Sequence, residues 1–422
     1  MRSLQPNIPA PTSKRRLVFF TLCMAYVSAG IVSILPGPTL PLLAANTSVP
    51  LDIAGSIFTT SATGFMFGVA LAGILSAKFG PKYVLLSGMA LLGFSAIITP
   101  LTHAFFLLLI VQFIQGIGFG FLDVSINIVV TLVFVDTLGE SLNNLHSSYG
   151  LGALIAPLLL SLALQTVHNA IPAYLIGAIV ALAGILILAP QRIPAPSMTR
   201  QRLSQQTSNP VVLKSILKNP LLWLMAVQMG FYVGAEIGFS NWIVTAVSLS
   251  ATISLALAAP CATFFWIGLT SGRLLSAQLL KRSLLSENQL LLLAIAGGGL
   301  SGLIVAIFPG YLPVSFSASA LVGLFFGPIF PGIMAIASRS FTNALSTVST
   351  TLLISAGASA MVLPALMGLL IPPIGVNWVM ALPALVCLAI GIPFIIAMQT
   401  QKRLPPPLQL PENTHKIKDE IS

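Results

Sequence analysis

The chain alternates long apolar stretches with short polar ones. About twelve of the apolar stretches approach the ~20 residues that an α-helix needs to cross the hydrocarbon core of a bilayer. They centre near Tyr26, Phe65, Leu92, Phe113, Ala156, Val180, Phe231, Ile267, Ile295, Gly323, Gly357 and Val386. The pattern therefore predicts an all-α membrane protein with twelve transmembrane helices.

One polar stretch, residues 191–219, is longer than the others and divides the chain in two. It contains Pro194, Pro196 and Pro210 together with five basic residues. Within it, Pro210–Asn219 has apolar residues and lysines at helical spacing, which predicts a short helix on the membrane surface. We therefore expect terminal tails at residues 1–16 and 399–422, and six-helix bundles at 17–190 and 220–398.

The two halves repeat one another. Phe65–Ala77 contains Phe-Met-Phe, Ala-Gly and Leu-Ser-Ala, and Phe264–Ala277 answers it with Phe-Phe-Trp, Ser-Gly and Leu-Ser-Ala. Repeated halves are typical of transporters, in which a binding site lies between two bundles that move against each other. The repeat predicts two pseudo-symmetric bundles.

Composition supports a membrane location. Of the 422 residues, 56% are hydrophobic and 7% are charged, whereas soluble domains carry about 25% charged residues. With twelve crossings, all nineteen Lys and Arg residues fall on the side of the two termini. The positive-inside rule makes that side cytoplasmic. The net charge of +10 therefore reflects the orientation of the chain in the membrane, and we expect no nucleic-acid partner. We expect the membrane to be the bacterial cytoplasmic (inner) membrane.

The stretch Gly73–Lys82, Gly-Ile-Leu-Ser-Ala-Lys-Phe-Gly-Pro-Lys, resembles the signature between the second and third helices of the major facilitator superfamily. The segment order and the central loop resemble that family too. The resemblance implies gating roles for its Gly and Lys residues and for one arginine in the mirrored loop of the second half. These residues are Gly73, Lys78, Gly80, Lys82 and Arg273. The family carries an aspartate where this chain has Ala77, which leaves the family's cytoplasmic latch incomplete.

Three further stretches, 116–127, 142–153 and 234–242, are similar to the fucose-permease-like branch of sugar:proton symporters. On this resemblance Asp123 occupies the position of a substrate-site glutamate in the fourth helix. The branch also has an essential acid in its first helix, and the corresponding stretch here, Ser28–Pro36, has none.

Two acids lie well inside apolar segments, Asp123 and Glu236, among nine acidic residues in the chain. An ionised Asp at the centre of a lone membrane helix costs roughly 2.5–3.5 kcal/mol, so both should face the bundle interior. Gln112, Gly116, Asp123 and Asn127 share one helical stripe, which we interpret as the wall of a water-filled cavity. A similar stripe holds Met229, Tyr232, Glu236 and Ser240. Buried acids of this kind either exchange protons or remain protonated as struts between helices.

The candidate binding residues for a solute are Gln112, Asp123, Asn127, Asn241, Trp242 and Trp266. A tryptophan can stack on a sugar ring, although many membrane tryptophans are interfacial anchors. Candidates for proton coupling are Glu236, Asp123 and His146, and His146 could equally be a hydrogen-bonding residue near a helix start. The three cysteines are too scattered for a metal cluster or a disulfide framework, and we expect no cofactor.

These features predict a monomeric, proton-coupled secondary transporter for a sugar or a similar polyhydroxyl solute. One alternative is a proton-coupled drug or metabolite antiporter, against which Ala156–Leu160 lacks the paired glycines typical of antiporters. The other is a receptor that kept the fold and lost transport. No hydrolase, nucleotide-binding or metalloprotease motif is present, so an enzyme is not expected.

Overall fold

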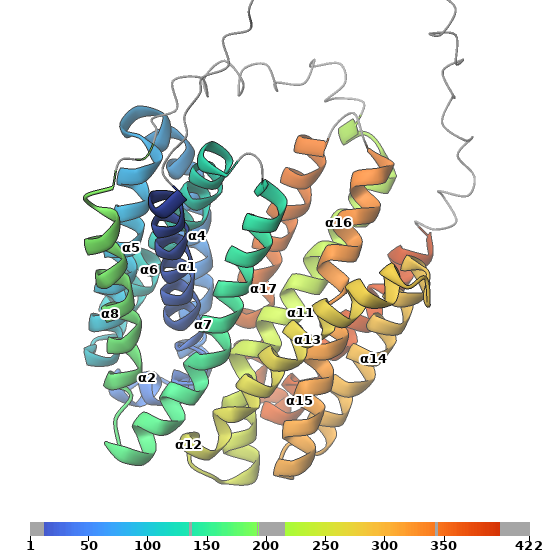
Figure 1. Ribbon diagram of the computed structural model, residues 1–422. Coiled ribbons are helices and arrows are strands. Elements are labelled where there is room, and N and C mark those ends of the chain that lie inside the picture. The colour runs from blue at the N-terminus through green and yellow to red at the C-terminus, as the bar shows by residue number, and fades with distance from the viewer. Residues whose placement is uncertain (1–11, 135–136, 192, 194–215, 342–344, 397–422) are drawn as a thin grey trace, which may run out of the picture.

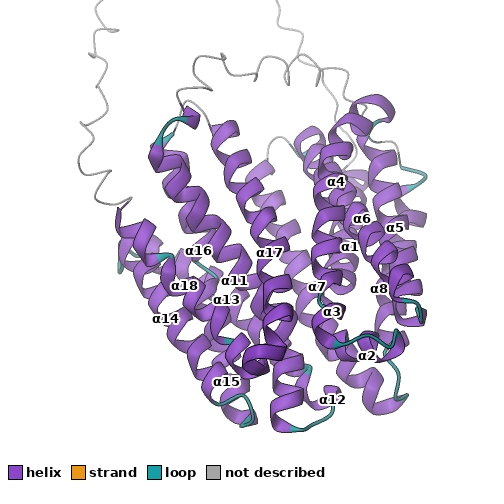
Figure 2. Ribbon diagram, turned by 180° about the vertical axis from the view of Figure 1, so that it is seen from behind, coloured by secondary structure: helices purple, strands orange, loops and turns teal. Residues whose placement is uncertain are grey.

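The structure is a computed structural model. It describes residues 12–134, 137–191, 193, 216–341 and 345–396. Every regular element in those ranges is a helix (Figure 2). The first half contains α1 (Thr12–Ile34), α2 (Leu40–Asn46), α3 (Leu51–Ala54), α4 (Ser56–Phe79), α5 (Pro81–Ile98), η1 (Thr99–Leu101), α6 (Phe105–Val133), α7 (Leu138–Thr166) and α8 (Ile171–Leu188). The second contains α11 (Pro220–Ala251), α12 (Leu255–Ala258), α13 (Pro260–Lys281), α14 (Glu287–Ile307), α15 (Leu312–Phe326), α16 (Ile329–Ser340), α17 (Leu345–Val379) and α18 (Ala381–Ala389).

In the described part of the chain, eleven helical spans are long and apolar enough to cross a membrane. A shorter apolar helical stretch, Ala381–Ile396, corresponds to the twelfth predicted segment. One span, Leu312–Ser340, joins α15 and α16, which are separated at Gly327 and Pro328. The predicted all-α membrane architecture is confirmed. Most of the predicted surface helix at Pro210–Asn219 lies outside the described residues.

The two halves lie side by side, α1 to α8 in blue to green and α11 to α18 in yellow-green to red (Figure 1). Glycines set equivalent helix pairs in both halves. A Cβ atom on Gly64 or Gly68 of α4 would collide with the backbone of α6, and one on Gly268 or Gly272 of α13 would collide with the backbone of α15. Small residues allow this close approach of membrane helices. The repeat seen in the sequence is therefore also a repeat of packing.

The halves are joined near one end of the molecule, the end that carries α2, α3 and α12. Ser161 Oγ on α7 donates to the Ala256 carbonyl at 2.6 Å, and Thr263 Oγ1 on α13 donates to the Leu154 carbonyl at 3.1 Å. Thr59 Oγ1 on α4 donates to the Met361 carbonyl on α17 at 3.2 Å. We call this end the sealed end. The opposite end carries Lys78, Lys82, Lys281 and Arg339, and we call it the basic end.

Candidate functional site

The first acid of the candidate site is held by a tyrosine from another helix. Tyr26 on α1 is 2% exposed, and its hydroxyl donates to Asp123 Oδ1 on α6 at 2.8 Å. Asn127 lies one turn further along α6 and donates its Nδ2 to the backbone carbonyl of Asp123 at 2.8 Å. The Asn127 side chain also interacts with the Tyr26 hydroxyl. The carboxyl group is thus fixed in place, while its second oxygen remains able to accept a hydrogen bond.

His146 borders this group on α7. Its side chain is exposed, yet its ring centroid lies 5.4 Å from that of Tyr26, and it attracts Asp123 electrostatically. An exposed side chain in contact with a buried one marks the boundary of the packed interior. Asp123 is itself half-buried, so Asp123 and His146 both lie at this boundary.

The second acid, Glu236 on α11, lies beside Tyr232 and Arg273. Glu236 is 8% exposed and Tyr232 is fully buried. Arg273, on α13, attracts Glu236 and interacts with the Tyr232 hydroxyl. That hydroxyl makes no hydrogen bond of regular geometry. The Arg273 side chain is itself exposed, so this group also borders solvent.

Tyr149 on α7 connects the two acids. Its ring stacks on Phe119 at a centroid distance of 5.5 Å and lies 6.4 Å from the rings of both Tyr26 and Trp266. The Tyr149 hydroxyl interacts electrostatically with Glu236, Asp123 and Arg273. Trp266 on α13 is 3% exposed, and its indole N–H is buried without a hydrogen-bond partner. An unpaired buried donor is free to bind a solute oxygen.

We call the group that these contacts define the central cluster. Its members come from α1, α6 and α7 of the first half and from α11 and α13 of the second. They are Tyr26, Asp123, Asn127, His146, Tyr149, Tyr232, Glu236, Trp266 and Arg273. The cluster combines two acids, a guanidinium group and several aromatic rings at the junction of the halves.

Three other candidate residues lie outside the central cluster. Gln112 is buried, and its Nε2 donates to Thr99 Oγ1 at 3.1 Å within the first half. Trp242 is fully buried, and its indole N–H donates to the Pro364 carbonyl at 2.9 Å. Asn241 packs against the backbone of Gly37. In this conformation Trp242 and Asn241 belong to the packing of the sealed end.

Gly116 of the α6 stripe, and Gly120 one turn further along α6, do not line a cavity. A Cβ atom on Gly116 or Gly120 would collide with the backbone of α4. These two glycines therefore serve the close packing of α4 and α6. This corrects the interpretation of the whole stripe as a cavity wall, because glycine at helical spacing is equally a signature of helix contact.

The candidate gating residues occupy different settings. Gly73 is exposed in α4, and Gly80 joins α4 to α5 with a positive φ of 91°. Lys82 Nζ donates to the carbonyls of Ala189 and Gln191 at 2.7 and 2.6 Å, which satisfies groups at the end of α8. Arg273 lies inside α13, eight residues before the helix ends at Lys281, and not in the following loop.

Sequence reasoning missed the roles of Tyr26 and Tyr149. Three of the six tyrosines in the chain, Tyr26, Tyr149 and Tyr232, meet in the central cluster. The available signal was a phenol inside an apolar segment, where its hydroxyl needs a partner. Among the residues described, no group of three His, Cys, Asp or Glu side chains could hold a metal ion.

The chain is similar in sequence to known membrane transporters. The family model described as the Major Facilitator Superfamily matches residues 22–352. Sodium-dependent glucose transporter 1 of Danio rerio is 25% identical over 400 residues, which cover 85% of this chain and 65% of that protein. The chain thus spans slightly less than two thirds of that relative.

Two bacterial proteins are similar over most of their length. The glucose/mannose transporter GlcP of Bacillus subtilis (strain 168) is 23% identical over 353 residues, which cover 81% of this chain and 85% of that protein. A crystal structure of the E. coli fucose:proton symporter FucP superposes with a TM-score of 0.59 and 19% identity, covering 90% of this chain and 98% of that chain.

Proposed function

The chain belongs to the Major Facilitator Superfamily, and from this premise we propose that it moves a sugar or similar polyhydroxyl solute across a membrane by alternating access. Membership confirms the resemblance drawn from the signature motif. The family is one of transporters and not of enzymes, and the chain is an integral multi-pass membrane protein.

The central cluster supports a polyhydroxyl solute. Such a ligand needs a few fixed acceptors and donors together with flat apolar surfaces. The Tyr26 hydroxyl donates to one carboxyl oxygen of Asp123, and the other oxygen can accept a hydrogen bond from the solute. Trp266 has an unpaired N–H, and the ring of Tyr149 lies between the two halves. The names of the relatives agree with this proposal, since they are glucose and glucose/mannose transporters.

The arrangement of the halves supports alternating access. Among the described residues, the hydrogen bonds that join the halves lie between the middle of the membrane helices and the sealed end. His146 and Arg273 of the central cluster are exposed. We interpret this as a conformation in which the site communicates with the basic end. The opposite conformation would break the hydrogen bonds of Ser161 and Thr263.

We propose that Glu236 carries a proton and that Asp123 mainly binds the solute, with His146 as a further proton-coupling candidate. When Glu236 releases its proton, the guanidinium of Arg273 can offset the charge that remains. Asp123 instead interacts with a tyrosine hydroxyl and with His146. Because the zebrafish relative is named sodium-dependent, sodium is the competing coupling ion.

We also propose an orientation and a mechanism of gating. The basic end, with both termini, faces the cytoplasm, because Lys and Arg favour that side, and the protein works as a monomer in a bacterial inner membrane. Gly73, Lys78, Gly80 and Lys82 would govern the change of conformation. Their setting at the α4–α5 turn, where Lys82 reaches the end of α8, supports a role in moving these helices together.

Purified protein in proteoliposomes tests the proposal directly. Labelled glucose, mannose and fucose should show saturable counterflow, and Asp123→Ala should raise its half-saturation concentration. Glu287→Gln, which alters an acid paired with Arg339 on the surface, is the control and should leave counterflow unchanged. Accumulation under an imposed pH gradient, compared with a sodium gradient, identifies the coupling ion. If no tested solute exchanges, transport of these sugars is ruled out and a receptor becomes the better interpretation.

A further inference from the structure

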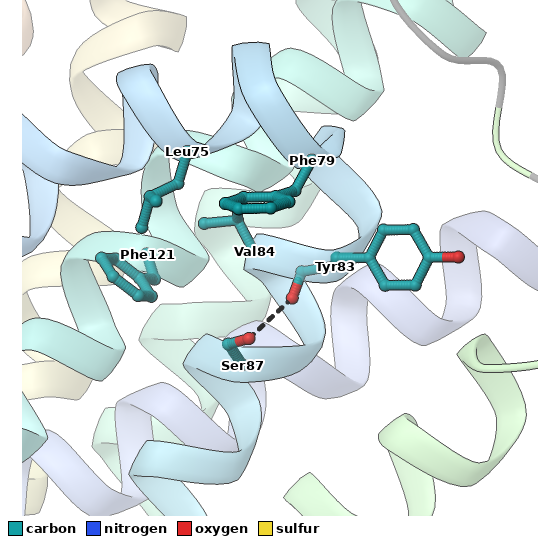
Figure 3. A pocket seen from close by; sticks show the side chains of 6 residues that line it. All are labelled: Leu75, Phe79, Tyr83, Val84, Ser87 and Phe121. Atoms are coloured by element: carbon teal, nitrogen blue, oxygen red, sulfur yellow. Dashed lines mark hydrogen bonds between the residues drawn. The ribbon is translucent and has the colours of Figure 1, made fainter.

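A second site lies away from the central cluster. An open groove of about 460 Å³ lies between α4, α5 and α6 near the basic end (Figure 3). Its volume falls within the roughly 300–1,000 Å³ of small-molecule pockets. Its lining is mostly apolar and comprises Leu75, Phe79, Tyr83, Val84, Ser87 and Phe121. We call it the α4–α5 crevice.

The crevice faces away from the solute site. Phe121 and Asp123 are two residues apart on α6, and each residue of an α-helix turns by about 100°, so their side chains point to nearly opposite sides. Asp123 points to Tyr26, whereas Phe121 lines the crevice. Phe79 and Tyr83 are 55% and 63% exposed. In a membrane protein this outer surface contacts lipid.

Two lysines flank the mouth of the crevice. The Lys78 ammonium lies 5.1 Å from the ring centroid of Phe79, and that of Lys82 lies 6.0 Å from the ring of Tyr83. Both residues line the crevice, and the Tyr83 ring points away from the other lining side chains (Figure 3). Lys82 also binds carbonyl groups at the end of α8. For Lys78 the described residues supply no hydrogen bond or ion pair, and the preceding residue is Ala77, so no carboxylate neutralises it there.

We propose that the α4–α5 crevice binds an anionic phospholipid, with an acyl chain among its apolar side chains and the phosphate on Lys78. The apolar lining, the lipid-facing mouth and the adjacent positive charge match the two parts of such a molecule. A sugar would lose its hydrogen bonds to water in this lining without gaining replacements. Anionic lipids attract lysines at the membrane surface.

The site has a structural consequence for α4 and α5. The two helices are joined at Gly80, and the crevice lies in the angle between them (Figure 3). At its other end α4 contacts α17 of the second half through Thr59. A lipid in the crevice would therefore hold α5 to a helix that also belongs to the seal between the halves.

Native mass spectrometry of the full chain in detergent tests the proposal. Phosphatidylglycerol and phosphatidylcholine with identical acyl chains are titrated in parallel. We expect the wild type to retain phosphatidylglycerol preferentially and Lys78→Gln to lose roughly fivefold in apparent affinity for it, the effect of one surface lysine. The matched control is Lys281→Gln, at the end of α13, the counterpart of α4 in the repeat. It should behave as the wild type does.

A second variant separates the crevice from general surface charge. Ser87 is exposed and lines the crevice, so Ser87→Leu fills the space without altering any charge or a buried contact. It should reduce retention of both lipids. Equal losses in Lys78→Gln and Lys281→Gln would overturn the proposal, and so would full lipid retention by Ser87→Leu. Competition by glycerophosphoglycerol, which has no acyl chains, as strong as that by phosphatidylglycerol would overturn it too.

Discussion

At the scale of single residues, the carboxyl of Asp123 depends on one hydroxyl for its position. Asp123→Asn keeps an oxygen that can accept the hydrogen bond from Tyr26, whereas Asp123→Ala removes the acceptor for both Tyr26 and a solute. We expect the Asn variant to retain part of the solute affinity. The Ala variant should lose roughly 1–3 kcal/mol of binding free energy, the cost of an unpaired buried polar group. Tyr26→Phe should give an intermediate loss, measured as the half-saturation concentration in counterflow. Equal affinities of the Asn and Ala variants would contradict a binding role for this oxygen.

Glu236 provides the second test at this scale, because its neighbour Arg273 carries the opposite charge. Glu236→Gln cannot release a proton, so it should abolish accumulation driven by a pH gradient and leave counterflow intact. Because the Arg273 side chain is exposed, the loss of the opposite charge should change the melting temperature little. The double variant Glu236→Gln/Arg273→Gln should likewise keep a melting temperature near that of the wild type, while accumulation stays absent. Persistent accumulation in Glu236→Gln would remove this acid from the coupling mechanism.

The residue scale also shows the limit of sequence reasoning. Asp123 and Glu236 could be singled out because a charge inside an apolar segment is costly wherever the helix lies. Whether Trp242 or Trp266 faces the site could not be decided, since both lie in helices and differ only in their partners. Trp242 donates to Pro364, 122 positions away in the sequence. Contacts of that range depend on how the helices pack, and helical spacing does not encode them.

At the scale of helices, the turn between α4 and α5 depends on Gly80. Its φ of 91° and ψ of 146° lie in a region that only glycine adopts readily, at a cost of about 1–3 kcal/mol for other residues. A Cβ atom there would meet nothing within 4 Å, so the backbone and not a clash explains the requirement. We expect Gly80→Val to slow transport with little change in solute binding.

The matched control for this turn is Gly73→Ala in α4. Gly73 is exposed, and a Cβ atom on it also meets nothing within 4 Å, but its backbone is helical. The substitution should therefore be neutral or stabilise the protein by roughly 0.5–1 kcal/mol. Thermal unfolding and initial rates of counterflow would separate the two variants. If Gly80→Val lost binding and transport equally, the turn would be a fold element and not a gate.

Helices themselves were well predicted, because apolar length is a local property of the sequence. Their breaks and pairings were not. The tenth predicted segment divides into α15 and α16 at Gly327 and Pro328, while α13 continues unbroken past Arg273 to Lys281. The family resemblance placed Arg273 in a loop, whereas the structure places it inside α13. In the folded chain its neighbours Glu236 and Tyr232 provide partners inside the helix bundle.

At the scale of the whole molecule, the basic and sealed ends should lie on opposite sides of the membrane. His168 follows α7 at the sealed end and Ser283 follows α13 at the basic end, and both are exposed with positive φ. In a background without Cys23, Cys261 and Cys387, a cysteine at position 168 should react with an impermeant thiol reagent added outside intact cells. A cysteine at position 283 should react only after the cells are permeabilised. Thr102 is less suitable for such labelling because its side chain is buried.

The same reagent can follow the conformational change. Thr263 is 3% exposed and bonded to the Leu154 carbonyl across the two halves, so a cysteine there should resist labelling from outside while the sealed end is closed. Opening of that end during transport would expose it, and we expect labelling to rise when a transported sugar is supplied. Thr166, exposed at the end of α7, is the control position and should label at a constant rate. Strong labelling at position 263 without solute would show that the conformation closed at this end is not the resting one, and equal rates with and without solute would contradict alternating access through it.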